Sequence, residues 1–225
     1  MPGVIVSYDG TRNDRDALAL GRLFSLAGAA ISLAYVRHVT EPDPQKEAAA
    51  EQQAAHLLSA GASLLGIDGV GENVIVDSST AEGLATLATQ LGAAVIAFGS
   101  DYRTPPGRVN VAQTPDQLLD RDIACSLAIA PAGLRREPVE QSIGTVGVYD
   151  EDDDEAASST AASLAHALGA VVTDGDADLL VIASRHDAPP GRLQLSATAR
   201  ERVEAALCPV LLLARGVTLA FDRAR

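Results

Sequence analysis

One eight-residue stretch occurs twice in the chain. Residues 104–111 are Thr-Pro-Pro-Gly-Arg-Val-Asn-Val, and residues 188–195 are Ala-Pro-Pro-Gly-Arg-Leu-Gln-Leu. Each stretch leads through a threonine, Thr114 or Thr198, into a predicted helix, and each helix ends at a cysteine that precedes an apolar strand. The two stretches therefore belong to two copies of one structural unit.

Strands and helices alternate on the N-terminal side of the first stretch. Apolar runs predict five strands, at residues 4–8, 31–36, 73–77, 94–99 and 126–131. Helical spacing of apolar residues predicts four helices, at residues 14–27, 46–60, 81–91 and 114–122. This alternation implies crossover connections and a mainly parallel sheet, whose buried strands are apolar on both faces.

The second copy repeats this order in a shorter form. The run from Val146 to Asp150 matches the opening strand, down to its Tyr-Asp ending, but one helix, one strand and a further helix are missing afterwards. We therefore predict an α/β fold with two Rossmann-like parallel-sheet units in tandem, packed as an intramolecular pseudo-dimer. The predicted parts are a complete unit at 1–132, a linker at 133–142, a truncated unit at 143–216 and a C-terminal tail at 217–225.

Composition excludes several classes of function. The 225 residues contain 17 Lys and Arg against 30 Asp and Glu, a net charge of -13, and only 3% of them are aromatic. This composition argues against a nucleic-acid partner, because phosphate binding needs basic side chains and single strands need aromatic ones. No apolar run is long enough to span a membrane, and no signal peptide precedes the first strand. With only two cysteines and no disulfide framework, a cytoplasmic protein is expected.

The arrangement resembles the universal stress protein family, in particular its tandem two-copy form. The resemblance rests on Tyr8-Asp9-Gly10-Thr11 after the first strand, Phe98-Gly99-Ser100 after the fourth, and the closing run Cys208-Pro209-Val210-Leu211-Leu212. It covers nearly the whole chain. It implies an adenine nucleotide alpha hydrolase-like fold and a role in the stress response.

The nucleotide-binding members of that family carry Gly, two residues, Gly, nine residues, and then Gly followed by Ser or Thr. Counted from Gly99, the later positions hold Tyr102, Ala112 and Gln113, so only the first glycine is present, although Thr114 offers a hydroxyl one place further on. In the second copy the corresponding residues are Ala183, His186, Ser196 and Ala197, and none matches.

An anion site on the first copy remains a hypothesis despite these losses. Hydroxyls, arginines and loop amides next to a helix N-terminus can form an anion-binding nest. The resemblance adds two residues, Asp9 and Val36, at the adenosine end of such a pocket. The candidate nucleotide-binding residues are Asp9, Val36, Gly99, Ser100, Arg103, Arg108, Gln113 and Thr114. The expected ligand is ATP or AMP, with magnesium.

Two other functions remain open. The first is a scaffold or interaction protein of the same family that has lost its ligand and binds an unidentified protein partner. The second is an enzyme such as a slow ATPase, which the sequence does not favour. The sole lysine, Lys46, lies outside any Walker A motif, and the sequence contains no nucleophile elbow. We therefore expect a protein that is not an enzyme.

The remaining titratable residues are expected to have structural roles. The four histidines lack zinc spacing, and the acidic run 151–155 suits a solvated helix start. Cys125 and Cys208 precede the last strand of each copy and are expected to be buried and inert. If those strands pair antiparallel, the thiols lie too far apart for a disulfide. Pairing of the two units would cover the edge of the first sheet, and the sequence leaves open whether two chains form a further homodimer.

Overall fold

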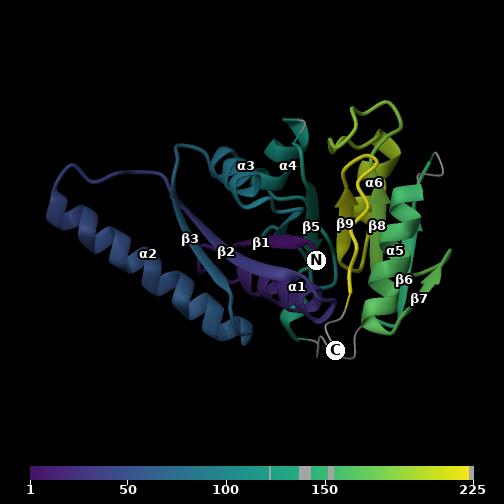
Figure 1. The fold of residues 1–225 in the computed structure, drawn as a ribbon, viewed down its shortest axis with the longest axis horizontal. Helices are drawn as coiled ribbons and strands as arrows, with labels where there is room; N and C mark the ends of the chain where they lie inside the picture. Colours follow the sequence, from purple (N-terminus) through teal and green to yellow (C-terminus); the bar gives the residue numbers. More distant parts are fainter. Residues whose placement is uncertain (122, 137–142, 152–154, 223–225) are drawn as a thin grey trace.

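The computed structural model describes residues 1–121, 123–136, 143–151 and 155–222. These residues form one sheet between two layers of helices (Figure 1). The sheet has nine strands in the order β3-β2-β1-β4-β5-β9-β8-β6-β7. All neighbouring strands are parallel except β5 and β9. The predicted α/β class with a mainly parallel sheet is confirmed.

Two units make up this sheet. The first unit contains β1 (Gly3–Ser7), α1 (Asp14–Leu26), β2 (Ala30–Arg37), α2 (Pro44–Leu65), β3 (Gly71–Val76), α3 (Thr80–Leu91), β4 (Val95–Gly99), α4 (Gln113–Asp120) and β5 (Ser126–Ala130). The second unit contains β6 (Thr145–Tyr149), α5 (Glu155–Leu168), β7 (Val171–Thr173), β8 (Leu179–Ala183), α6 (Ala197–Ala205) and β9 (Val210–Leu213). A 3-10 turn, η1 (Leu134–Arg136), follows β5. The boundaries of the units, linker and tail stay predictions.

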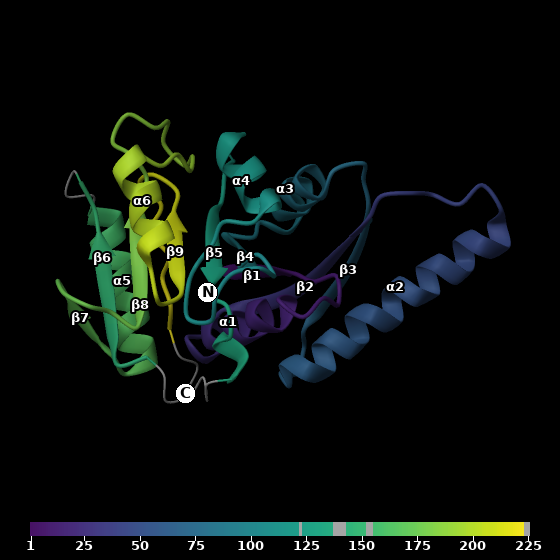
Figure 2. The same ribbon diagram turned by 180° about the vertical axis from the view of Figure 1, so that it is seen from behind.

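Each face of the sheet has its own apolar core. One core joins the sheet to α1, α2 and α5, with Phe24, Leu58 and Leu164 among its fully buried side chains. The other joins the opposite face to α3, α4 and α6 (Figure 2). Because both cores run through both units, burying them stabilises the chain as one body.

The two units meet at β5 and β9. These strands pair antiparallel, with Leu127 opposite Leu212 and Ile129 opposite Val210. In this register Cys125 and Cys208, which precede the two strands, lie at opposite ends of the pair. Both thiols are free. The predicted antiparallel junction and the predicted lack of a Cys125–Cys208 disulfide are therefore confirmed.

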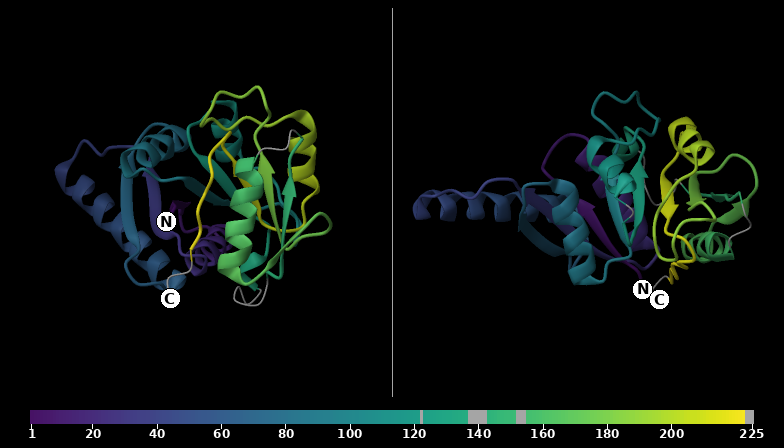
Figure 3. Two further views of the ribbon diagram at one scale, coloured as in Figure 1. Left: turned by 45° about the vertical axis from the view of Figure 1, so that its right-hand side comes forward. Right: turned by 90° about the horizontal axis from the view of Figure 1, so that it is seen from above.

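Helix α2 is longer than the predicted 46–60. It begins at Pro44, where the Asp43 side chain caps it by accepting a hydrogen bond from the Gln45 amide (2.9 Å). It ends at Leu65 and is followed by the capping residue Gly66, which has a φ of 67°. Proline at the start and a left-handed glycine at the end are favoured signals. Its N-terminal half reaches beyond the body of the molecule (Figure 3), and Ala48 and Ala49 in that half are exposed.

Residues 217–222, which we call the C-terminal strap, connect the two units on the α1 face. The ring of Phe221 stacks on Phe24 of α1, with centroids 5.8 Å apart. On the other side, the Leu219 amide donates to Thr160 Oγ1 of α5 at 3.0 Å, and Ser163 Oγ donates to the Leu219 carbonyl at 2.8 Å. The strap therefore ties α5 to α1.

Other predictions concern residues that the structure describes only in part. Residues 137–142 of the predicted linker and residues 152–154 of the acidic run lie outside the described residues. In the part of the chain that is described, no helix is long and apolar enough to cross a membrane.

Candidate functional site

The candidate residues lie at the carboxyl edge of the first unit, where parallel strands end side by side. Asp9 follows β1, Gly99 ends β4, and Val36 lies near the end of β2. Val36 is only 6% exposed and packs in the core beneath α3. The topology therefore brings the strand ends together, but the Val36 side chain belongs to the core.

Asp9 forms a carboxyl pair with Asp14 at the start of α1. The amides of Asp9 and Thr11 donate to Asp14 Oδ2 at 2.6 and 3.2 Å, and the Thr11 amide also donates to Asp9 Oδ1 at 2.9 Å. Burial, assisted by Asp9, raises the pKa of Asp14 to about 8. Burial alone would raise the pKa of Asp9 too, but hydrogen bonds from Asp14 and Thr11 lower it. At neutral pH the proton therefore lies on Asp14, and Asp9 is the carboxylate.

Gly99 is required by packing within the first unit. A Cβ at this position would overlap the carbonyl of Asn13, which precedes α1. The oxygen and carbon of this carbonyl are backbone atoms, so no rotation of a side chain can relieve the overlap with the added Cβ. The absence of a side chain at Gly99 therefore lets α1 approach β4, whether or not a ligand is present.

Ser100 has its hydroxyl inside the protein. The residue is 1% exposed; its Oγ donates to the Ala130 carbonyl at 2.7 Å and accepts from the Asn110 amide at 3.0 Å. In the second unit Ser184 Oγ likewise accepts from a loop amide, that of Gln194, at 3.1 Å, and it donates to the Arg192 carbonyl of the same loop at 3.2 Å. Because both units share this pattern, the serine fixes the loop that follows the strand.

The two loops that contain the Pro-Pro-Gly-Arg repeat reach into each other's units. The Val109 amide donates to the carbonyl of Ala206 at 3.2 Å, and the Leu193 amide donates to the carbonyl of Ile123 at 3.0 Å. The side chains of Val109 and Leu193 are both buried. The repeat that revealed the duplication therefore builds the junction between the units.

The remaining candidates lie on the outside of this loop and at the start of α4. Arg103 and Arg108 are exposed, and the Arg103 guanidinium lies over the Tyr102 ring, 4.9 Å from its centroid. Gln113 is the first residue of α4 and Thr114 the second. Ala112 caps this helix with no side-chain hydrogen bond, whereas Ser196 caps α6 by accepting from the Ala199 amide at 3.0 Å.

Comparison with known proteins identifies the fold. No family model matches the sequence, and no curated protein is similar to it. A universal stress protein from Archaeoglobus fulgidus DSM 4304 superimposes over 95% of this chain and 98% of its own, with a TM-score of 0.70 and 15% identity. The chain has the universal stress protein fold.

Two further solved structures are similar to this chain with lower TM-scores. A functionally unknown protein from Pseudomonas aeruginosa PAO1 covers 96% of this chain and 93% of its own, with a TM-score of 0.63 and 14% identity. A universal stress protein in complex with cAMP covers 58% of this chain with a TM-score of 0.43, a similarity too low to transfer its ligand.

Within this universal stress protein fold, two hollows flank the loop after β4. One, of about 190 Å³, is bounded by the start of α1, by Tyr102 and by residues 132–136; the other, of about 370 Å³, is bounded by the loop and by Glu204 of α6. Of the candidates, only Arg103 and Arg108 line either hollow. The sequence analysis did not single out Arg12, Arg135 and Arg136; the adjacent pair Arg135-Arg136 in an acidic chain was a visible signal, whereas Arg12 joins it only in the fold.

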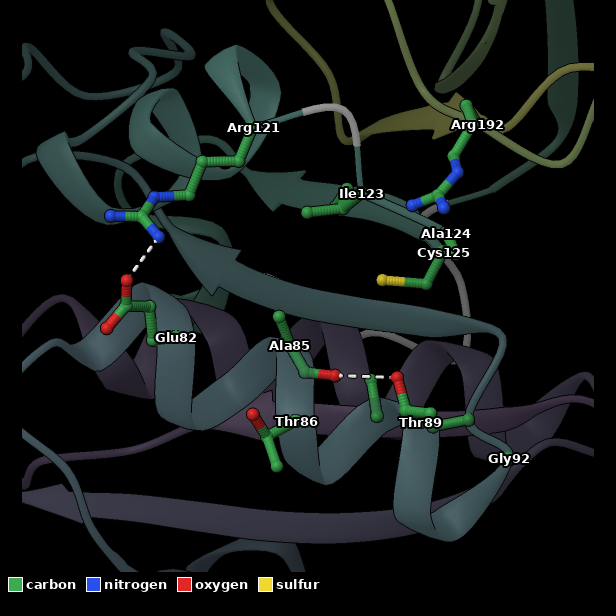
Figure 4. A pocket seen from close by; sticks show the side chains of 12 residues that line it. Glu82, Ala85, Thr86, Thr89, Gly92, Arg121, Ile123, Ala124, Cys125 and Arg192 are labelled. Atoms are coloured by element: carbon green, nitrogen blue, oxygen red, sulfur yellow. Dashed lines mark hydrogen bonds and ion pairs between the residues drawn. The ribbon is translucent and has the colours of Figure 1, made fainter. Parts of the chain in front are cut away.

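A third cavity, of about 570 Å³, lies between α3 on one side and Arg121 and residues 123–125 on the other (Figure 4). An ion pair between Glu82 and Arg121 closes one end, and Arg192 of the second unit lies at the other. Burial raises the pKa of the Cys125 thiol, which faces this space, to about 12. The thiol is therefore no nucleophile at neutral pH, and none of the candidate residues lines the cavity.

Proposed function

We propose that this chain is a stress-response protein of the universal stress protein family that works as a non-nucleotide-binding scaffold. The observation that carries this proposal is the structural use of the loop after β4. Gly99 accommodates α1, the Ser100 hydroxyl is bonded to β5 and to the Asn110 amide of the loop, and Val109 bonds to the second unit. The groups that would cradle a phosphate are thus already engaged in the fold.

An adenine nucleotide on the first unit is the second candidate. It is favoured by one observation: Arg103 and Arg108 are exposed at the carboxyl edge where the fold's ligands bind. In this alternative they would hold the phosphates of ATP or AMP, with magnesium. We propose no catalysis in either case, because no nucleophile and base set stands out among the candidates.

Calorimetric titration of ATP and AMP with magnesium into the full chain tests the proposal. We expect no saturable heat up to about 1 mM ligand, which corresponds to a binding free energy weaker than about -4 kcal/mol. Saturable binding would overturn it, and its loss in Arg108→Ala but not in Lys46→Ala would establish the nucleotide candidate. Gly99 is a poor position for a blocking variant, because any side chain there meets Asn13. Phosphate release from ATP, measured in parallel, tests for hydrolysis.

A further inference from the structure

Five arginines gather at one edge of an acidic protein. We call them the arginine rim; they line the two hollows on either side of the loop after β4, and they are Arg12, Arg103, Arg108, Arg135 and Arg136. The hollows adjoin each other, since both are bounded by Asp101 and Thr104. Four of the five arginines are exposed, so their charged heads face solvent.

The acidic residues in these hollows leave the rim positive. Three acids line them, namely Asp16, Asp101 and Glu204. Asp16 is 2% exposed and accepts from the Gly133 and Arg135 amides, both at 2.9 Å, and from Arg135 Nη1 at 2.6 Å. The charges of Asp16 and Arg135 therefore cancel each other. The remaining four arginines face two carboxylates, in a chain whose total charge is -13.

An exposed aromatic ring lies within the rim. Tyr102 is 68% exposed and carries the Arg103 guanidinium over its face. Aromatic rings are scarce in this chain, and the other tyrosines are buried or half-buried. Tyrosine and arginine are the residue types that most often anchor protein partners.

We propose that the arginine rim docks an acidic peptide segment of a partner protein. This inference rests on the proposed scaffold function and names its partner class. The arginines are divided between two hollows of about 190 and 370 Å³, so an extended ligand with several carboxylates contacts more of them than a small anion can. A nucleic acid extends past the rim, onto surfaces where the net negative charge repels its phosphates.

The test measures fluorescence anisotropy of the full chain with a labelled Asp- and Glu-rich peptide of about ten residues. We expect saturable binding that weakens as salt rises from about 0.05 to 0.5 M. Arg136→Glu and Arg12→Glu should each weaken the affinity for the peptide roughly tenfold. Arg103→Glu, a third variant in the loop after β4, should weaken it as well. Lys46→Glu makes the same change in net charge on α2 and should leave the affinity within about twofold. Thermal unfolding of each variant checks its fold.

Several outcomes would overturn the inference. They are the absence of saturable binding, equal binding of a peptide with Asn and Gln in place of the acids, equal weakening by Lys46→Glu, and displacement by inorganic phosphate at matched ionic strength. Tighter binding of a single-stranded oligonucleotide would reassign the rim to nucleic acid. Without peptide binding, the partner class fails while the scaffold proposal stands. Saturable ATP binding removes the scaffold proposal whatever the peptide does.

Discussion

Replacing Leu193 by alanine tests whether the two units unfold as one body. Leu193 belongs to the second unit and is 0% exposed, and its amide donates to the Ile123 carbonyl of the first unit at 3.0 Å. Its side chain packs in the core that α3, α4 and α6 share. The substitution therefore leaves a void at the junction, where side chains of both units lose contacts.

The expected loss of unfolding free energy is about 2–5 kcal/mol, the range measured for buried leucines. That is a large share of the roughly 5–15 kcal/mol that stabilise a typical domain. Urea unfolding followed by circular dichroism should show one transition at a lower midpoint with an unchanged slope. Leu207→Ala is the matched control, because Leu207 is 66% exposed and its loss should cost no more than about 0.5 kcal/mol.

Hydrogen exchange decides how far the effect spreads. If the junction couples the units, amides of β1 and β4 lose protection together with those of β8 and β9. Two separate unfolding transitions, or a destabilised second unit beside an unchanged first one, would refute this reasoning. A loss no larger than that of Leu207→Ala would refute the packing argument as well.

Three further perturbations have defined outcomes. Gly99→Ala should lower the unfolding free energy by about 1–3 kcal/mol through overlap with the Asn13 carbonyl, whereas Gly144→Ala, whose new Cβ finds its nearest neighbour 3.5 Å away, should change it little; comparable urea midpoints would contradict this. The folded-state pKa of Asp14 is raised from 3.8 to about 8, so its contribution to stability is full below pH 3.8 and is lost as pH rises to about 8. Asp14→Asn should remove that slope from thermal unfolding measured across this pH range, and an unchanged slope would show that another group titrates. Phe221→Ala should cost roughly 3 kcal/mol, the low end for phenylalanine because the strap can peel away instead of leaving a void; proteolysis should then cut within 217–222 faster than in Leu207→Ala, and equal rates would contradict the strap.

The order of elements was predictable from the sequence because its signals are local or repeated. The two copies of the Pro-Pro-Gly-Arg stretch revealed the duplication, and apolar runs located the five strands of the first unit and the opening strand of the second. The full length of α2 was also signalled, by Asp43-Pro44 at its start and Gly66 at its end. Leu58, Gly61 and Leu65 continue the buried face at helical spacing, so the sequence carried this signal past residue 60.

The use of individual side chains was not predictable, since it depends on partners far along the chain. Ser100 meets the Ala130 carbonyl, and Asp16 meets the Arg135 amide. Neither pairing leaves a mark in the local sequence. Phe221 fell in the predicted tail, although a phenylalanine is a rare residue in this chain and hinted at burial.

The antiparallel junction of β5 and β9 joins two unequal units, which bears on the valency of the molecule. A symmetric dimer of identical subunits shows every surface twice and can therefore crosslink two copies of a partner or gain avidity from a bivalent one. Here the described residues of the second unit form no counterparts of α2, β3 and α3, and every arginine of the rim comes from the first unit or from the turn after β5. If the arginine rim docks an acidic segment as proposed, each chain would therefore engage one such segment through this surface, without the avidity of a two-fold symmetric dimer.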